Sequence, residues 1–321
     1  MILKTSKENI IKAAEEIKRG GIVAFPTETV YGLGADCTNP LAVSKIFEAK
    51  NRPSFNPLIV HVHHAKSVDN IAYIDNDNVE KIIDKFWPGP LTIVLPKKEV
   101  IPEIVTAGHS TVAVRMPSHP VALELIELSG TSIAAPSANS FGFLSPTHAV
   151  HVEKQLGSKV NIILDGGESH VGVESTIIEF VENKVKILRP GGLALEEIKK
   201  VVPEVEYTNR VLDAPNAPGM LFHHYAPSVP IKFLDEINLN KIDAERTGVL
   251  LFNGRKFNDA YKVKRVLTTS DNLNEAAANL FKYLHELENE DIDLILAEKV
   301  EQTGLGYAIM DRLTRAANRY R

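Results

Sequence analysis

The chain has 321 residues, of which 44% are hydrophobic and 24% charged, and its formal net charge is −5 at pH 7. This composition is typical of a globular protein with a substantial core, and the length predicts one large or two ordinary domains. The negative balance argues against a globally basic nucleic-acid binder, although not against a local basic patch. Cys37 is the one cysteine, so no intrachain disulfide can form, and we expect a cytoplasmic protein.

The N-terminal stretch, residues 1–21, predicts an amphipathic helix that stops at Gly20 and Gly21. Ile10, Ala14 and Ile17 recur at helical spacing. The stretch lacks the apolar centre of a signal peptide, and no apolar run of the chain approaches membrane-spanning length. We therefore expect no membrane association.

Residues 21–57 carry the densest group of informative residues. A short apolar run, residues 22–25, predicts a strand that Pro26 ends, and small hydroxyls with one acid follow. We interpret the next glycines, Gly32 and Gly34, as part of a polar turn. Asn39 then predicts the start of a helix that ends just before a basic pair. Strand, turn and helix in this order place hydroxyls and cations at one sheet edge, a common ligand position in α/β proteins.

The rest of the first two thirds alternates between short strands and helices. Further strands are predicted at 58–62, 91–95, 111–115, 132–135 and 161–164, with a hairpin of 175–180 and 185–189 around Asn183. Helices are predicted at 78–86, 120–128, 148–156 and 195–200. We expect a mixed, twisted α/β sheet whose strands end in a polar rim.

A change in composition follows at about residue 209. Residues 209–230 are rich in proline, which predicts a linker, but they are too apolar for a free tether. We expect this segment to dock on the first domain, either as a lid over a ligand site with Tyr225 close to the ligand, or only as a contact that joins the two domains. The α/β alternation then restarts, so we expect a first domain at 1–208 and a small Rossmann-like α/β domain at 231–321.

Several common catalytic motifs are absent from the sequence. The dipeptide Gly-Lys does not occur, which excludes a P-loop, and no Gly-x-Ser-x-Gly or His-Glu-x-x-His is present. The histidines at 61, 63 and 64 have no partner at metal-ligand spacing, so we expect no protein-held metal. Gly304 and Gly306 are interpreted as a helix start and not as a nucleotide fingerprint.

What remains is a set of cations and small polar residues at the predicted ends of elements. Arginine binds phosphate and carboxylate through two parallel hydrogen bonds, and lysine supplies a mobile charge. Hydroxyl and amide side chains orient a polar ligand. An anionic substrate with both phosphates and a carboxylate fits this set: Lys50, Arg52, Arg115, Arg189, Thr27, Thr29, Ser137, Asn139, Ser145, Ser175 and Thr176.

Taken together, these residues identify a resemblance that covers essentially the whole chain. The chain resembles the Sua5/YrdC/YciO family, specifically its longer two-domain Sua5 type of threonylcarbamoyl-AMP synthase. The matching segments are PTETVYGLG (26–34), Lys50-Asn51-Arg52, FWPGPLT (86–92), VAVRMP (112–117), Ser137-Ala138-Asn139, VESTII (173–178), LRPGG (188–192), HHYAP (223–227) and GLGYAIMDRLTRAA (304–317). The Lys-x-Arg and Ser-x-Asn pairs make the match specific.

The resemblance implies a nucleotidyltransferase. Such enzymes combine L-threonine, bicarbonate or CO2, and ATP into threonylcarbamoyl-AMP and pyrophosphate, for the t6A modification of tRNA. Mg²⁺ is expected to be carried mainly by the ATP phosphates. The implied partners are these substrates, the downstream t6A transfer machinery, and a contact with tRNA.

Carried over residue by residue, the resemblance implies a role for each matching position. The residues implied in catalysis are Lys50, Arg52, Ser137 and Asn139. Those implied to hold threonine are Thr29, His61, Arg115, Ala135 and Ser175. Those implied to hold ATP are Lys50, Arg52, Asn56, Thr111, Ser137, Asn139, Ser145, Arg189 and Tyr225.

Two other functions remain open from the sequence. One is a non-catalytic module that binds double-stranded RNA, as short relatives are linked to such RNA. The other is a different carbamoyl or acyl transferase on the same fold. The complete Lys-x-Arg and Ser-x-Asn pairs favour the synthase.

Overall fold

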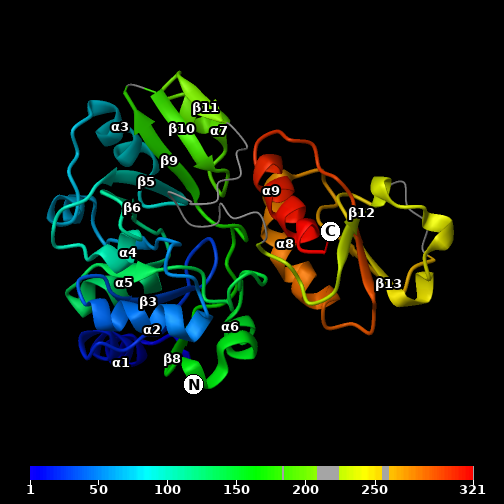
Figure 1. Cartoon of the computed structure of the whole chain (residues 1–321), viewed down its shortest axis with the longest axis horizontal. Coiled ribbons are helices and arrows are strands. Elements are labelled where there is room, and N and C mark those ends of the chain that lie inside the picture. Colours follow the sequence, from blue (N-terminus) through cyan, green and yellow to red (C-terminus); the bar gives the residue numbers. More distant parts are fainter. Residues whose placement is uncertain (183, 208–223, 255–259, 321) are drawn as a thin grey trace.

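The computed structural model describes residues 1–182, 184–207, 224–254 and 260–320. Within these residues the strands form two separate sheets, one of eleven strands and one of four (Figure 1). The first sheet belongs to the predicted first domain and the second to the C-terminal domain. The predicted α/β class with a mixed sheet and a smaller second domain is therefore confirmed.

The first domain surrounds the large sheet with helices on both sides (Figure 1). Its strands, in the spatial order β1-β8-β2-β3-β7-β4-β6-β5-β9-β10-β11, are β1 (Ile2–Lys4), β8 (Ile162–Asp165), β2 (Val23–Phe25), β3 (Gly32–Asp36), β7 (Ile133–Ala135), β4 (Ile59–His61), β6 (Thr111–Arg115), β5 (Leu91–Pro96), β9 (Thr176–Val181), β10 (Lys184–Arg189) and β11 (Val205–Tyr207). Its helices are α1 (Lys7–Lys18), α2 (Pro40–Lys50), α3 (Asp77–Phe86), α4 (Glu103–Thr106), α5 (Pro120–Ser129), α6 (Ala149–Leu156) and α7 (Leu195–Lys199).

The register of the central strands brings distant residues to one place. Strand β4 is parallel to β6, which sets His61 beside Arg115, and β5 is antiparallel to β6, which sets Thr92 beside Arg115. Strand β9 is parallel to β5 and adds the segment around Thr176. Because side chains of paired residues lie on the same face of a sheet, this register fixes one cluster of polar groups.

Two predictions of local structure were wrong. The helix predicted over residues 1–21 begins only at Lys7, where Ser6 caps it by accepting from the amide of Asn9, and Ile2–Lys4 form a strand paired with β8. The predicted polar turn contains strand β3. Its Gly34 is packed so closely that an added Cβ would lie 2.5 Å from Ile133 and 2.7 Å from Phe25. Close packing of neighbouring side chains thus overrides the weak strand preference of glycine here.

The second domain is a four-stranded parallel sheet with two helices packed against it. Its strands, in the order β12-β15-β13-β14, are β12 (Ile231–Phe233), β15 (Leu294–Ala297), β13 (Thr247–Leu251) and β14 (Val263–Val266), and its helices are α8 (Leu273–Leu287) and α9 (Gly306–Asn318). Helix α9 begins at Gly306, which confirms the predicted helix start.

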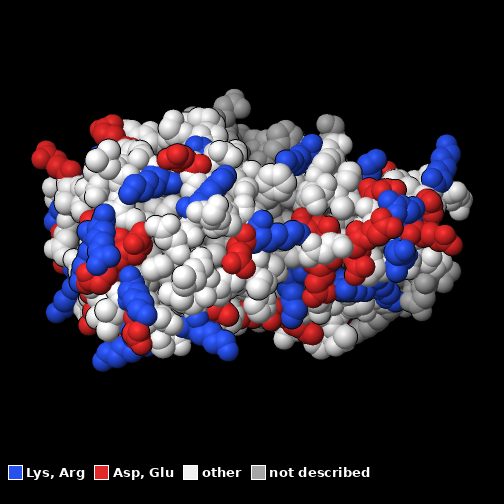
Figure 2. Space-filling model, turned by 90° about the horizontal axis from the view of Figure 1, so that it is seen from below, with Lys and Arg blue, Asp and Glu red and all other residues white. Residues whose placement is uncertain are grey.

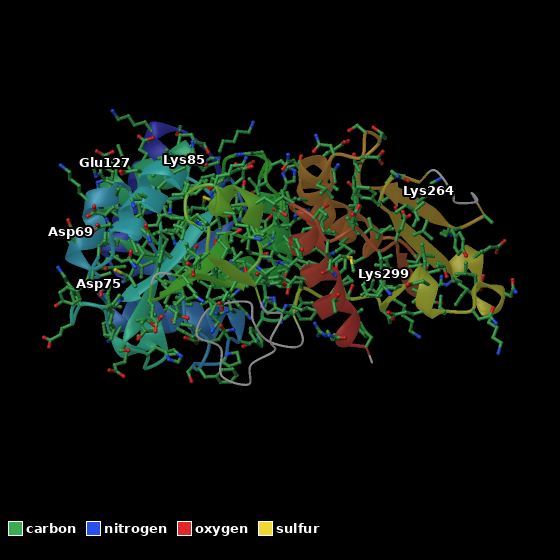
Figure 3. The ribbon with its side chains drawn as sticks, turned by 90° about the horizontal axis from the view of Figure 1, so that it is seen from above. Asp69, Asp75, Lys85, Glu127, Lys264 and Lys299 are labelled. Atoms are coloured by element: carbon green, nitrogen blue, oxygen red, sulfur yellow. The ribbon has the colours of Figure 1, made fainter. Side chains whose placement is uncertain are left out.

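Helices α8 and α9 lie on the side of the second domain that faces the first (Figure 1). Figure 3 shows the same arrangement from above: Asp69, Asp75, Lys85 and Glu127 belong to the first domain, and Lys264 and Lys299 to the second. Several contacts join the two domains, including a hydrogen bond of 3.1 Å between His285 Nε2 and the carbonyl of Ser145. No described helix is long and apolar enough to cross a bilayer.

Most of the predicted linker, residues 209–223, lies outside the described residues, as does residue 208. The described end of the linker contacts the first domain, where the amide of Ala226 donates to the carbonyl of Gly142 at 3.0 Å. Ala226 also forms an isolated parallel bridge with Phe143. The predicted domain boundaries stay predictions.

Candidate active site

A cavity opens where the central strands, the end of α2 and the segment at 224–225 meet. Its volume is about 50 Å³. The side chains that line it are Thr27, Thr29, Val30, Tyr31, Gly32, Arg52, Ile59, His61, Arg115, Ala135, Pro136, Ser137, Glu174, Ser175, Arg189, His224 and Tyr225. Most predicted site residues are therefore neighbours in space, although they come from segments spread from residue 27 to residue 225.

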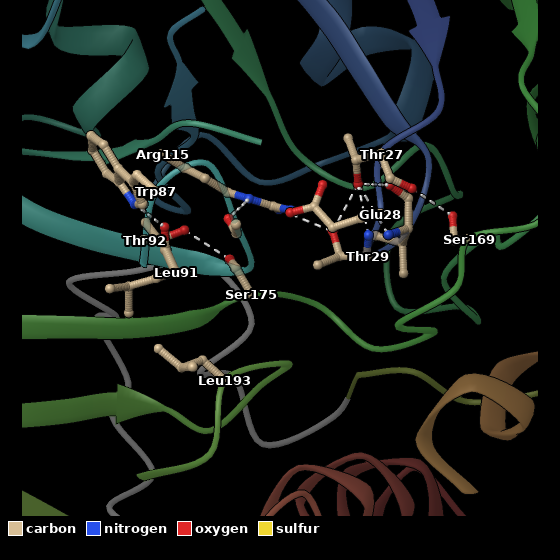
Figure 4. A network of polar contacts seen from close by, with 12 residues as sticks. Thr27, Glu28, Thr29, Trp87, Leu91, Thr92, Arg115, Ser169, Ser175 and Leu193 are labelled. Carbon is tan, nitrogen blue, oxygen red and sulfur yellow. Dashed lines mark hydrogen bonds and ion pairs between the residues drawn. The ribbon is translucent and has the colours of Figure 1, made fainter. Parts of the chain in front are cut away.

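Arg115, at the end of β6, is held by three groups. Its Nη1 donates to the hydroxyl of Thr29 at 2.9 Å, its Nη2 to Glu28 Oε1 at 2.5 Å, and its Nε to the carbonyl of Gly89 at 3.3 Å (Figure 4). Two of the five guanidinium N–H groups remain for a ligand after these bonds. An arginine fixed in this way is prepared to bind a carboxylate through two parallel hydrogen bonds.

Glu28 is the buried counter-ion of Arg115. Burial alone would raise the pKa of Glu28, but the charge and hydrogen bond of Arg115 outweigh burial and hold that pKa below its usual range. Its Oε2 has no hydrogen-bond partner among the described residues. The turn is fixed by Thr27, whose hydroxyl donates to the carbonyl of Val30 at 2.6 Å and lies 2.8 Å from that of Thr29.

His61 lies beside Arg115 with its Nδ1 3.2 Å from the carbonyl of Ile59. Burial, followed by the charge of Arg115, lowers the pKa of His61 to about 3. The imidazole is therefore neutral at physiological pH, and it offers the cavity a polar ring without a charge.

Ser175 is oriented from two sides. Its hydroxyl shares a hydrogen bond of 2.7 Å with the buried hydroxyl of Thr92 on β5 (Figure 4). Arg189, at the end of β10, donates through Nη2 to the carbonyl of Ser175 at 2.8 Å. These bonds tie the start of β9 to both neighbouring strands and fix the position of Ser175 in the cavity wall.

The two basic residues at the end of α2, Lys50 and Arg52, have different partners. Asn51 between the two cations adopts a left-handed conformation (φ 52°) and caps the helix, which turns Lys50 and Arg52 to different places. Arg52 reaches the cavity and donates to the carbonyls of Asn56 at 3.1 Å and Pro57 at 2.8 Å. Burial, partly offset by Tyr225, lowers the pKa of Arg52 to about 9.

Lys50 is buried against the loop of the Ser-x-Asn pair. Its Nζ donates to the carbonyl of Ser137 at 2.6 Å and also to the carbonyl of Asn139. Burial, together with the nearby charge of Arg52, holds the pKa of Lys50 well below its usual value. The hydroxyl of Ser137 donates to Asn139 Oδ1, and Asn139 Nδ2 donates to the carbonyl of Phe143 at 2.9 Å. Lys50 thus supports the loop from behind.

Five predicted site residues do not line the cavity. Lys50, Asn139 and Ser145 lie directly behind its wall, and the hydroxyl of Ser145 donates to Glu174 Oε1. Asn56 is fully buried, and both polar atoms of its side chain are without a hydrogen-bond partner among the described residues. Thr111 lies at the opposite end of β6 from Arg115, about 13 Å away at the usual rise of a strand.

Sequence reasoning missed several residues that the structure brings to the site: Glu28, Thr92, Glu174, His224 and Arg312. All five lie within or beside the motifs that were recognised. Only the structure shows that Glu174 and His224 line the cavity and that Glu28, Thr92 and Arg312 bond to residues that line it. Among the described residues no group of three or more His, Cys, Asp or Glu could hold a metal ion.

The family models that match this chain cover both domains. Residues 15–191 match a family described as "Telomere recombination", and residues 193–318 match one described as "Threonylcarbamoyl-AMP synthase, C-terminal domain".

The similar proteins agree with this result. A threonylcarbamoyl-AMP synthase of Pyrococcus abyssi is 46% identical over 95% of this chain and 93% of its own length. One of Bacillus subtilis is 39% identical over 98% of this chain and 94% of its own length. The crystal structure of P. abyssi Sua5 complexed with L-threonine matches with a TM-score of 0.90 and 43% identity, covering 99% of this chain and 97% of that one.

Proposed function

The chain belongs to the two-domain threonylcarbamoyl-AMP synthases, and from this membership we propose how its cavity carries out the reaction. The substrates are L-threonine, bicarbonate or CO2, and ATP, and the product serves the t6A modification of tRNA. The observation that carries the proposal is the convergence of Arg52, Arg115 and Arg189 on one small cavity. Three arginines around a single cavity suit a substrate pair with a carboxylate and a triphosphate.

Threonine occupies the end of the cavity around Arg115. The two remaining N–H groups of Arg115 bind the threonine carboxylate, since Glu28 and Thr29 already hold the guanidinium in place. The hydroxyl of Ser175, the neutral ring of His61 and the backbone at Ala135 surround the rest of the amino acid. Because His61 carries no charge, it does not repel the ammonium form in which threonine enters the cavity.

ATP occupies the end around Arg52 and Arg189. These two cations bind phosphate oxygens, and Ser137 lies with them in the cavity wall. Lys50 and Asn139 hold the Ser137 loop from behind, and Ser145 acts through Glu174, so their contribution is indirect in this structure. Asn56, with its unpaired buried amide, is a further group for the nucleotide. The role of Thr111 in ATP binding stays a prediction.

The chemistry has two steps. The nitrogen of threonine attacks CO2 and loses a proton, which forms an N-carboxylate. One oxygen of this carboxylate then attacks the α-phosphorus of ATP, the bond between that phosphorus and the bridging oxygen breaks, and pyrophosphate leaves. The protein provides no nucleophile, so positioning and stabilisation of negative charge by Arg52 and Arg189 account for the rate.

Mg²⁺ enters with ATP. The acids at the cavity, Glu28 and Glu174, are each paired with an arginine, so they are poor ligands for a cation. Phosphate oxygens suit Mg²⁺ better, and the ion neutralises part of the phosphate charge.

His224 and Tyr225 act as a lid. The cavity of about 50 Å³ is smaller than the roughly 300–1,000 Å³ of ordinary ligand pockets, so ATP requires this wall to move. Tyr225 has a left-handed backbone (φ 62°), which is uncommon for an aromatic residue and indicates a constrained position. Closure of the lid excludes water and protects the mixed anhydride from hydrolysis.

The RNA-binding alternative receives less support. On the face shown in Figure 2, Lys and Arg side chains lie among Asp and Glu side chains over both domains. A module that binds RNA without catalysis needs a basic surface, whereas the arginines discussed here are buried in a cavity.

The test is pyrophosphate release by the purified chain. The synthase requires ATP, threonine and bicarbonate together, and omission of any one should abolish release. Release without threonine would favour a different carbamoyl or acyl transferase. No release under any condition, together with binding of double-stranded RNA, would favour the RNA-binding module.

A further inference from the structure

Arg312 of helix α9 crosses from the second domain to the wall of the cavity. It is among the largest fully buried side chains of the described residues. Its Nε donates to Glu174 Oε2 at 2.8 Å, and its Nη1 donates to the carbonyl of Pro190 and to Asp311 Oδ2, both at 2.8 Å. Two of these three partners, Glu174 and Pro190, belong to the first domain.

Glu174 connects Arg312 to the nucleotide end. It lines the cavity, and its other oxygen accepts from the hydroxyl of Ser145. Burial alone would raise the pKa of Glu174, but the charges of Arg312 and Arg189 hold it below its usual range. The carboxylate is therefore ionised, and Arg312 and Arg189 both stabilise it.

Tyr225 is the second connection. The guanidinium carbon of Arg312 lies 5.0 Å from the centre of the Tyr225 ring, within the range of a cation–π contact. Phe281 of α8 packs against the same ring at 5.7 Å. The Nη2 of Arg312 and the hydroxyl of Tyr225 are both buried without a hydrogen-bond partner among the described residues.

The other ion pairs between the two domains, among the described residues, differ from this one. Lys282 lies 3.2 Å from Glu168, and both side chains are about one third exposed. Lys154, half exposed, lies 3.7 Å from the mostly buried Glu288, so solvent reaches at least one member of each pair. Such exposed pairs contribute little to docking. The Arg312–Glu174 pair is buried, and its Glu174 lines the cavity. This ion pair can therefore affect the cavity as well as join the domains.

We propose that Arg312 is a positioning residue of the synthase reaction, which holds Glu174 and Tyr225 so that the second domain completes the ATP end of the cavity. This inference rests on the proposed function, and it assigns the C-terminal domain an indirect part in nucleotide binding. Arg312 itself does not line the cavity, so it acts through the two residues that do.

The test separates the two substrates. In Arg312→Lys a charge remains, but an ammonium group cannot reproduce the planar fork that reaches Glu174 and Pro190 together. We expect the KM for ATP to rise about tenfold or more, while the KM for L-threonine stays within about twofold of the wild-type value. Lys282→Met, which removes an exposed interdomain pair, is the matched control and should leave both KM values unchanged.

A second variant keeps the test valid if Arg312→Lys fails to fold. Glu174→Gln combined with Arg312→Gln removes both charges of the pair, so that neither is left alone in the interior. It should also raise the KM for ATP selectively. If either variant folds and lowers only kcat, with both KM values unchanged, Arg312 is merely structural and the inference is wrong. Absence of threonine-dependent turnover in the wild type would instead defeat the proposed function.

Discussion

Lys50 and Arg52 are two residues apart in the sequence and have different partners in the structure. Lys50 donates to carbonyls of the Ser137–Asn139 loop, whereas Arg52 lines the cavity. The Lys-x-Arg spacing predicted that both cations serve the site, but it could not show that Asn51 turns them apart. Cap geometry of this kind depends on a single left-handed residue, which the sequence permits without requiring.

This division predicts different phenotypes for the two cations. Arg52→Ala should lower kcat/KM for ATP about 100-fold, since the loss of charge-assisted bonds costs roughly 2–3 kcal/mol. Lys50→Met should lower kcat/KM for ATP less than Arg52→Ala does, because Lys50 does not line the cavity. Both variants should lower the free energy of unfolding, because each leaves two carbonyls without a donor at about 1–3 kcal/mol each. Steady-state kinetics and urea unfolding on both variants measure this difference. Equal losses of kcat/KM for ATP in the two variants would contradict it.

His61 predicts a specific pH dependence of stability. Its pKa is about 3 in the folded protein, so between the ordinary histidine pKa and that value only the unfolded chain binds a proton there. The free energy of unfolding must therefore fall as the pH drops through this window, by at most about 1.4 kcal/mol per pH unit from this residue. His61→Gln removes this contribution.

The measurement compares urea unfolding of the wild type and His61→Gln at about pH 7.5 and about pH 5. The variant should lose less stability than the wild type between the two values. A larger loss in the variant would show that His61 is not a buried neutral imidazole. The shape of the pH–rate profile above about pH 5 should be the same for both proteins.

At the scale of elements, the strands with apolar runs were predicted well and the glycine-rich strand was not. Strand β6 has the predicted limits, residues 111–115, because its continuous apolar run, residues 112–114, is bounded by polar residues and followed by Pro117. Strand β3 contains Gly32 and Gly34, whose absent side chains make room for Phe25 and Ile133. Strand β3 forms because neighbouring strands pack against it, and its own sequence has no apolar pattern that predicts a strand.

The C-terminal cap of α2 provides a test at this scale. Asn51 adopts φ 52°, where glycine is unstrained and a β-branched residue is strongly disfavoured. Asn51→Val should cost about 1–2 kcal/mol of stability and also reduce activity, because it displaces Arg52. Asn51→Gly is the matched control and should be nearly neutral in both respects. Thermal melting and pyrophosphate release are measured for both variants. If Asn51→Gly loses as much stability and activity as Asn51→Val, the role given to the cap is contradicted.

At the scale of the whole molecule, the sequence predicted two domains but not how the second contributes to the site. The residues concerned, Glu174 and Arg312, are 138 positions apart. Neither a period nor a short motif connects positions so distant in the chain, so only the folded structure shows the pair. The proposed lid could not be predicted in detail for the same reason. Tyr225 contacts Arg312 and Phe281 of the second domain, and it lines the cavity together with Arg52 and Glu174 of the first.

The lid proposal predicts the behaviour of Tyr225→Ala. Without this ring, the closed cavity loses a wall and water reaches the bound adenylate. The variant should bind ATP more weakly and release a larger share of AMP, the product of adenylate hydrolysis, than the wild type. Chromatographic separation of AMP from the intact adenylate provides the ratio. An unchanged ratio and an unchanged KM for ATP would make the segment a tether only.

The central claim is that one chain joins threonine, bicarbonate and ATP in this cavity. The most direct measurement is mass spectrometry of the product formed from carbon-13-labelled bicarbonate by the wild type and by Arg115→Ala. The wild type should yield threonylcarbamoyl-AMP that carries the label in its carbamoyl carbon, and the variant should yield little or none. An adenylate without the label, or equal product from both proteins, would contradict the account.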